Sequence, residues 1–153
     1  MDYNDVLRKI RYAFDFSDAQ MMKLFALGGI SATRAEVSNW LKSERDEEMV
    51  ALQGEELSRF LNGLIIYKRG KQEGVEPIVE KEINNNIILR KLKIALALKD
   101  TDIIDLVEKV GLFLSKHELS AFFRKPTQTQ YRICKDQFLR NFLHSLEVYR
   151  TPK

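Results

Sequence analysis

Apolar residues recur along this chain at intervals of three and four positions, the spacing of amphipathic helices. No window alternates between apolar and polar residues as a half-buried strand would, so the pattern predicts an all-α fold. The apolar stripes and their flanking polar residues place four helices in the first half of the chain. They are expected over about 4–14 with Asn4 as N-cap, from Ser17 to the glycine pair at Gly28, from Thr33 to about 42, and from Gly54 to before Gly70.

The same pattern occurs a second time when the sequence is shifted by 82 positions. Leu7-Arg8-Lys9 then falls on Leu89-Arg90-Lys91, and the register holds without a gap to Tyr67 and Tyr149. Between the copies lies a stretch with two glycines, a proline and a run of charges, a composition typical of a linker. We therefore predict two tandem homologous four-helix domains, at 1–69 and 84–153, joined by a linker at 70–83. Each copy is small for a core of its own, so we expect the copies to pack on each other.

The third predicted helix of each copy begins with a capping box, Thr33 with Glu36 and Ser115 with Glu118. With the helix before it, it forms a pair that resembles a helix-turn-helix, the arrangement in which a second helix enters the DNA major groove. The turn is about two residues longer than in the tight repressor motif. Two packed helices with a polar outer face are also the commonest motif of all-α proteins, so this alternative stays open.

Composition excludes several classes of protein. The single cysteine, Cys134, excludes an internal disulfide and a cysteine-cluster metal site. The N-terminus has no apolar signal core and no run approaches about 18 apolar residues, so we expect a soluble cytoplasmic protein. The net charge of +3 is unevenly placed, since residues 84–153 hold 13 Lys/Arg and 7 Asp/Glu, a net +6. Attraction to a polyanion is therefore expected in the second copy.

Several ordered motifs are similar to those of one family. "NDVLRKIRYAFDFSDAQMMKLFALGG" and "FLNGLIIYKRGK" are followed by a second "LRKLKIAL", then by "ELSAFFRKP" and "LRNFL". In this order they resemble the bacterial YehS-like family of duplicated helical proteins, over nearly the whole chain. The resemblance implies tandem helical domains and a bacterial cytoplasm. It supplies no catalytic residue to carry over.

The inventory of catalytic side chains is thin. The two histidines, His117 and His144, have no ligand-type residue four positions on, and Cys134 aligns with Leu52, as a small core residue would. The glycine pair before the third helix lacks the Lys-Ser/Thr of a phosphate loop. We therefore expect no enzyme activity, no cofactor and no metal.

Cations that recur in register are the best candidates for binding. We expect phosphate contacts from the second copy and base contacts from its third helix, with weaker counterparts in the first copy. The candidates are Arg90, Lys91, Lys93, Arg124 and Lys125 for phosphates, Lys116, His117 and Ser120 for bases, and Arg8, Lys9, Arg11, Ser38 and Lys42 in the first copy. Lys68 and Arg150 are a further recurring pair. A solvated helix face also needs charges, and cations stabilise helix C-termini.

The leading hypothesis is therefore a non-catalytic nucleic-acid-binding protein, with DNA or RNA as partner. The alternative is a protein–protein interaction module, which the acidic run Glu44–Glu48 of the first copy suits better. The corresponding stretch of the second copy, "KPTQTQYRICKD", has no such run. Because the copies diverge most here, this loop is where different partners are expected.

Overall fold

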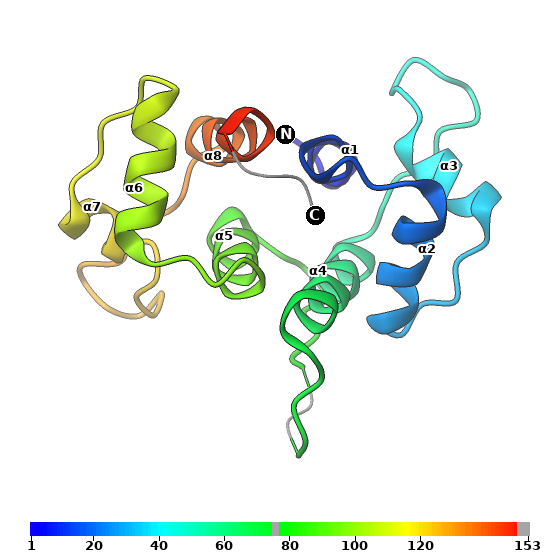
Figure 1. The fold of residues 1–153 in the computed structure, drawn as a ribbon, viewed down its shortest axis with the longest axis horizontal. Coiled ribbons are helices and arrows are strands. Elements are labelled where there is room, and N and C mark those ends of the chain that lie inside the picture. The colour runs from blue at the N-terminus through cyan, green and yellow to red at the C-terminus, as the bar shows by residue number, and fades with distance from the viewer. Residues whose placement is uncertain (75–76, 150–153) are drawn as a thin grey trace.

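The computed structural model describes residues 1–74 and 77–149, and within them it contains eight α-helices and no strand, which confirms the all-α prediction (Figure 1). The helices are α1 (Tyr3–Phe14), α2 (Asp18–Leu27), α3 (Arg34–Leu41), α4 (Gly54–Arg69), α5 (Asn85–Ala95), α6 (Asp100–Lys109), α7 (Lys116–Ala121) and α8 (Asp136–Tyr149). Each helix of the second repeat begins 82 positions after its counterpart, so the tandem duplication is a property of the fold. Arg150 lies outside the described residues.

The helix starts follow local capping chemistry, with one correction to the sequence prediction. Ser17, Thr33 and Ser115 each accept a hydrogen bond from the third residue of their helix, as their capping boxes predict. Helix α1, however, is capped by Asp2, whose carboxylate accepts from the amide of Asp5 at 2.8 Å. Asn4 is not the cap, because its side chain is buried and bonded to other parts of the repeat.

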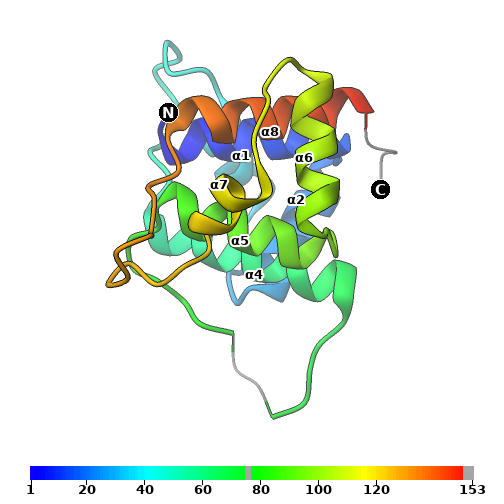
Figure 2. The same cartoon turned by 90° about the vertical axis from the view of Figure 1, so that its left-hand side faces the viewer.

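The eight helices are arranged with an approximate two-fold relation between the repeats. Helices α1, α4, α5 and α8 lie at the centre, with α2 and α3 on one side and α6 and α7 on the other (Figure 1). Between the repeats, α4 packs on α5 and α1 packs on α8. Figure 2 shows α8 lying alongside α1. Each contact is the counterpart of the other, since the shift of 82 positions turns α1 into α5 and α4 into α8.

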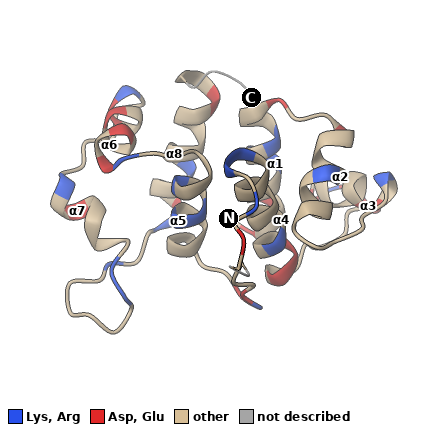
Figure 3. Ribbon diagram, turned by 60° about the horizontal axis from the view of Figure 1, so that its bottom comes forward, with Lys and Arg blue, Asp and Glu red and all other residues tan. Residues whose placement is uncertain are grey.

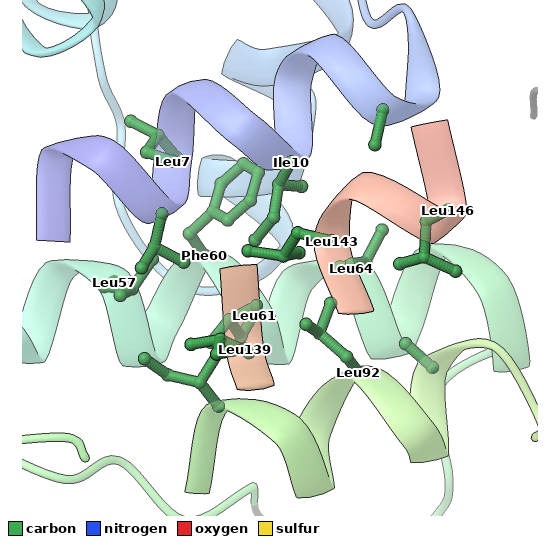
Figure 4. Packing of buried hydrophobic residues seen from close by; sticks show 14 of the residues in the cluster. Leu7, Ile10, Leu57, Phe60, Leu61, Leu64, Leu92, Leu139, Leu143 and Leu146 are labelled. Carbon is green, nitrogen blue, oxygen red and sulfur yellow. The ribbon is translucent and has the colours of Figure 1, made fainter. Parts of the chain in front are cut away.

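One continuous hydrophobic core joins the two repeats, as expected for copies that are small on their own. Leu7 and Ile10 of α1, four residues of α4, Leu92 of α5 and three leucines of α8 meet at its centre (Figure 4). Burial of each such side chain contributes about 1.5–3 kcal/mol. Because both repeats contribute to this one cluster, they are expected to fold together.

A close helix crossing distinguishes the first repeat. A Cβ atom on Gly63 of α4 would lie 1.8 Å from the carbonyl oxygen of Leu24 in α2, and one on Gly28 would lie 1.8 Å from that of Arg59. Only glycine fits at such a distance. The counterpart of Gly63 is Ser145, whose hydroxyl donates to Phe142 O at 2.6 Å. The crossing therefore fixes how α2, and with it α3, sits on the central helices.

Candidate nucleic-acid interface

The loop between the third and fourth helices has the same backbone anchor in both repeats. In the second repeat the buried amide of Asn86 donates to the carbonyls of Phe122 at 3.0 Å and Arg132 at 2.7 Å, and accepts from the Cys134 amide at 2.9 Å. Asn4 makes the three corresponding bonds to Trp40, Val50 and Leu52, at 2.8 to 2.9 Å. A buried asparagine on the first helix thus pins each loop.

The two loops share their internal turns as well. In the first loop the Asp46 amide donates to Ser43 O and the Met49 amide to Asp46 O. The second loop repeats both bonds at the positions 82 residues later, Gln128 to Lys125 and Tyr131 to Gln128. The backbone scaffold is therefore the same, and the loops differ in the side chains that they display.

These two loops carry opposite charge. The loop at 122–135, called the basic loop here, contains Arg124, Lys125, Arg132 and Lys135 and no acidic residue. The loop at 42–53, called the acidic loop, contains two cations and four acidic residues, Glu44, Asp46, Glu47 and Glu48. In Figure 3 the basic loop lies at the end of the molecule that holds the second repeat, next to α7. Equivalent surfaces of the two repeats therefore present net charges of +4 and −2.

Arg132 and Lys135 were not among the cations selected from the sequence. Both are exposed, and Arg132 lies close enough to Glu118 of α7 to help lower the pKa of that carboxyl, although its hydrogen bonds to Ser115 contribute more. Selection of residues that recur in both repeats could not find them, because their counterparts are Val50 and Gln53. A comparison of charge loop by loop would have found them.

Two of the predicted phosphate-binding cations form ion pairs within their own repeat. Arg11 bonds to Asp18 at 3.1 Å, and its counterpart Lys93 bonds to Asp100 at 2.6 Å. Each pair ties the first helix of a repeat to the start of its second helix. Lys93 also lies 4.3 Å from the centre of the Phe123 ring. This internal pairing explains why the cation and the acid recur together, without a need for a ligand.

Lys91 is not available to a phosphate, which corrects the sequence prediction. Its side chain is 6% exposed, and its ammonium group contacts Glu80 at 3.1 Å and donates to Asn62 at 2.6 Å. Burial lowers the pKa of Lys91, and the Glu80 carboxylate opposes that shift. Burial also raises the pKa of Glu80, but hydrogen bonds from Ser58 and Lys91 outweigh it and hold that pKa below its ordinary value of 4.5.

The candidates of the first repeat are held by other contacts in their own repeat, apart from Lys9. Arg8 pairs with Asp5 at 2.6 Å and donates to the carbonyl of Lys42 at 2.7 Å. The Lys42 ammonium donates to Asn39 at 2.9 Å and lies 3.4 Å from Glu48 of the acidic loop. Ser38 is half-buried, whereas Lys9 has no hydrogen bond or ion pair among the described residues. The first repeat therefore offers few free cations on this surface.

Some of the α7 residues predicted to contact bases are exposed, and others are not. Lys116 and His117 are exposed at its first turn. Ser120 is half-buried and its hydroxyl donates to the His117 carbonyl at 2.9 Å. Ala121, which the helical spacing places on the outer face, is 4% exposed because it packs under the basic loop, whose Arg132 amide donates to its carbonyl.

Three phosphate candidates of the second repeat remain at the surface, Arg90 on α5 and Arg124 and Lys125 in the basic loop. Lys125 and Arg90 are exposed, whereas Arg124 is half-buried with a buried Nε atom that has no hydrogen-bond partner. With Lys116, Arg132 and Lys135 these residues form the candidate interface. It combines a positive surface with few partners of its own, the property that phosphate recognition requires.

The structure also places the cysteine and the two histidines. Cys134 is buried, and burial raises the pKa of its thiol to about 12, so it is held as the neutral thiol. Both histidines are exposed, and no group of three metal-ligating side chains comes together within 1–74 and 77–149. Over the same residues, none of the helices has both the length and the apolar character that crossing a bilayer requires.

Comparison with known proteins shows the family. The family described as "Protein of unknown function (DUF1456)" matches residues 3–70 and 85–151, once in each repeat. The chain belongs to this family. It is similar to "Uncharacterized protein YehS" of Escherichia coli (strain K12), with 41% identity over 153 residues that cover 98% of this chain and 97% of that protein. No solved structure matches the chain.

Proposed function

We propose that the protein is a non-catalytic nucleic-acid-binding protein of the bacterial cytoplasm, and that it binds through the second repeat. The basic loop and Arg90 contact phosphates. Helices α6 and α7 act as a helix-turn-helix-like pair that brings Lys116 and His117 toward the bases. The observation that carries the proposal is the contrast between the two loops, which share one backbone scaffold and differ by six units of charge.

This contrast supports a ligand role because folding does not require it. The same anchor and turns hold the acidic loop, so the cations of the basic loop are not needed to form the structure. Exposed like charges repel one another slightly, and a bound polyanion would remove this unfavourable electrostatic energy. The side chains of Lys125, Arg132 and Lys135 form no ion pair among the described residues, and the one carboxylate noted near them, Glu118 beside Arg132, is exposed. All three cations can therefore reach phosphates.

The test is a salt-dependent titration of a fluorescent 20-base-pair DNA duplex and a 20-nucleotide RNA, read as anisotropy. At about 50 mM salt we expect a Kd in the micromolar range, with affinity falling steeply as salt rises. The triple variant Lys125→Ala/Arg132→Ala/Lys135→Ala is expected to bind at least tenfold more weakly. Its slope of log K against log salt should be smaller by about 2.7 on duplex, about 0.9 for each lost contact.

A matched control removes the same charge elsewhere. Lys23, Arg34 and Arg45 are exposed and lie in the first repeat, and their triple alanine variant should retain nearly the full affinity and slope. Absence of binding to both probes at about 50 mM salt contradicts the proposal. Equal losses in the two triple variants contradict it too, because they would indicate attraction to net charge alone.

Docking of a protein partner is the second candidate function. The observation that favours it is the surface along the contact between α1 and α8, where charged side chains are exposed. This surface is separate from the basic loop.

A further inference from the structure

The two inter-repeat contacts, here called the α4–α5 seam and the α1–α8 seam, are counterparts, but within residues 1–74 and 77–149 a loop segment covers the first and not the second. Residues 78–83 cross the α4–α5 seam as a segment with neither helix nor strand. The Ile78 carbonyl accepts from Asn62 at 2.9 Å and from Lys91 at 3.1 Å, and the Glu80 carboxylate accepts from Ser58 at 2.6 Å. The Glu80 amide donates back to the Ser58 hydroxyl at 3.1 Å. The chain thereby shows how an acidic segment binds this type of seam.

Each residue of α4 and α5 that bonds to the acidic segment has a counterpart in the α1–α8 seam. The counterparts of Ser58 and Asn62 on α8 are Arg140 and His144, and the counterpart of Lys91 on α1 is Lys9. The ends of the seams correspond as well. A Cβ on Gly54 would approach the backbone of Glu82, one residue before Ile83, and the counterparts of Gly54 and Ile83, Asp136 and Met1, form an ion pair at 2.9 Å.

Burial shows that the second seam is open. Ser58, Asn62 and Lys91 are 0%, 3% and 6% exposed under the acidic segment. At the α1–α8 seam, Arg140 and His144 are exposed and Lys9 is half-buried. No described segment crosses this seam in the manner of residues 78–83.

The open seam also lacks the carboxylate that balances its counterpart. Lys91 has Glu80, whereas Lys9 has no ion pair or hydrogen bond among the described residues. Arg140 has a favourable neighbour in Asp136, but that carboxylate is already bonded to the N-terminal ammonium group and to Asn85. His144 lies 3.8 Å from Glu147. Across the three compared positions, arginine in place of serine gives this seam one more positive charge than the covered one.

A cavity of about 750 Å³ adjoins the seam at the C-terminal end of α1, between Tyr12, Phe16 and Glu147. Two large apolar side chains lie exposed on the two helices, Tyr12 at 70% and Val148 at 50%. They offer apolar contact surface beside the cations, a combination that suits a peptide better than a nucleic-acid backbone.

We propose that the α1–α8 seam binds an extended acidic peptide segment of a partner protein. A Glu or Asp of that segment accepts from Lys9 and Arg140, as Glu80 accepts from Lys91 and Ser58 on the other seam, and its flanking residues lie toward Tyr12 and Val148. The internal segment is the template for the chemistry of the ligand. The site is separate from the basic loop, so it does not depend on nucleic-acid binding.

The probe is a synthetic peptide with the sequence of residues 77–83, PIVEKEI, titrated into the full ¹⁵N-labelled chain and followed by amide chemical shifts. We expect saturable shifts on α1 and α8, including those of Tyr12, His144 and Val148. The peptide PIVQKEI lacks the carboxylate that corresponds to Glu80 and should bind about tenfold more weakly. The variants Lys9→Ala and Arg140→Ala should each weaken PIVEKEI by a similar factor.

Two controls separate this site from the others. The basic-loop triple variant should bind the peptide as the parent does, whether or not it binds nucleic acid. Lys116→Ala, which removes an exposed cation on α7, should also leave peptide affinity unchanged. The proposal is overturned by absence of shifts at millimolar peptide, by shifts confined to α4 and α5, or by equal binding of PIVQKEI. It is also overturned if a DNA duplex saturates the α1 and α8 shifts more tightly than the peptide does, since the seam would then be a phosphate site.

Discussion

Replacement of Asn86 by alanine tests the loop anchor and the shared core in one experiment. The side chain makes three hydrogen bonds to loop backbone at 2.7 to 3.0 Å. Each is worth about 0.5–1.5 kcal/mol net, and a buried group left without a partner costs more. We therefore expect Asn86→Ala to lower the free energy of unfolding by about 3 kcal/mol. With a urea m-value of about 2 kcal/mol/M, the midpoint should fall by roughly 1.5 M.

The assay is urea unfolding followed by far-UV circular dichroism and by the fluorescence of Trp40. This single tryptophan lies in the first repeat, on α3, and is buried against Phe25. Because one core joins the repeats, Trp40 should report the same lowered midpoint as the circular dichroism, although the mutation is in the second repeat. Asn141→Ala is the control, since the side chain of Asn141 has no hydrogen bond among the described residues, and its midpoint should stay within about 0.3 M of the parent.

Two results would refute this reasoning. A shift as small as that of the control would show that the Asn86 bonds do not hold the loop. A biphasic transition in which the Trp40 midpoint is unchanged would show that the repeats unfold independently. The shared core would then not make the two repeats unfold cooperatively.

Three further predictions concern other buried groups. Glu80→Gln should lower the free energy of unfolding by about 1–3 kcal/mol at neutral pH. The pKa of Glu80 is lower in the folded than in the unfolded state, so its stabilising contribution is complete above the unfolded-state pKa and is lost as pH falls through the folded-state pKa. The difference in stability between the variant and the parent should therefore disappear when unfolding is measured at progressively lower pH. Gly63→Ala should cost about 3 kcal/mol in thermal unfolding, because the added Cβ would lie 1.8 Å from a carbonyl oxygen, whereas Ser145→Ala at the equivalent position should cost under about 1 kcal/mol. Cys134, with a thiol pKa of about 12, should react with a thiol reagent at pH 8 only after unfolding in urea, and prompt reaction of the native protein would contradict its burial.

The helical part of the fold could be predicted from the sequence because its signals are local. Apolar spacing and paired capping boxes predict the helices, and the shift of 82 positions predicts the register of the repeats. The cap of α1 was missed because Asp2 and Asn4 are both good capping residues. Only the tertiary fold shows that Asn4 is needed in the interior, where it reaches loop backbone 36 to 48 positions away.

The candidate site was less predictable, because recurrence of a residue does not reveal its reason. Arg11 and Lys93 recur since each pairs with an acid of the next helix. Lys9 and Lys91 also recur, yet Lys9 is half-buried without an ion pair among the described residues, whereas Lys91 is buried under the acidic segment. That segment is part of the linker, whose composition gave no sign that it packs on a helix seam. The sequence predicts which cations exist, and contacts between distant segments decide which of them are free.

The covalent link between the repeats has a consequence for how the surface can change over time. Two separate copies of one repeat, packed through the same seams, would form a symmetric dimer in which every substitution appears twice. A substitution that made a loop basic in such a dimer would make it basic in both subunits. A ligand that bound one seam would bind the other equally well. In a single chain, a substitution in one repeat leaves the other repeat unchanged. The acidic loop opposite the basic loop, and the covered seam opposite the open one, are differences that a symmetric dimer of identical repeats could not hold.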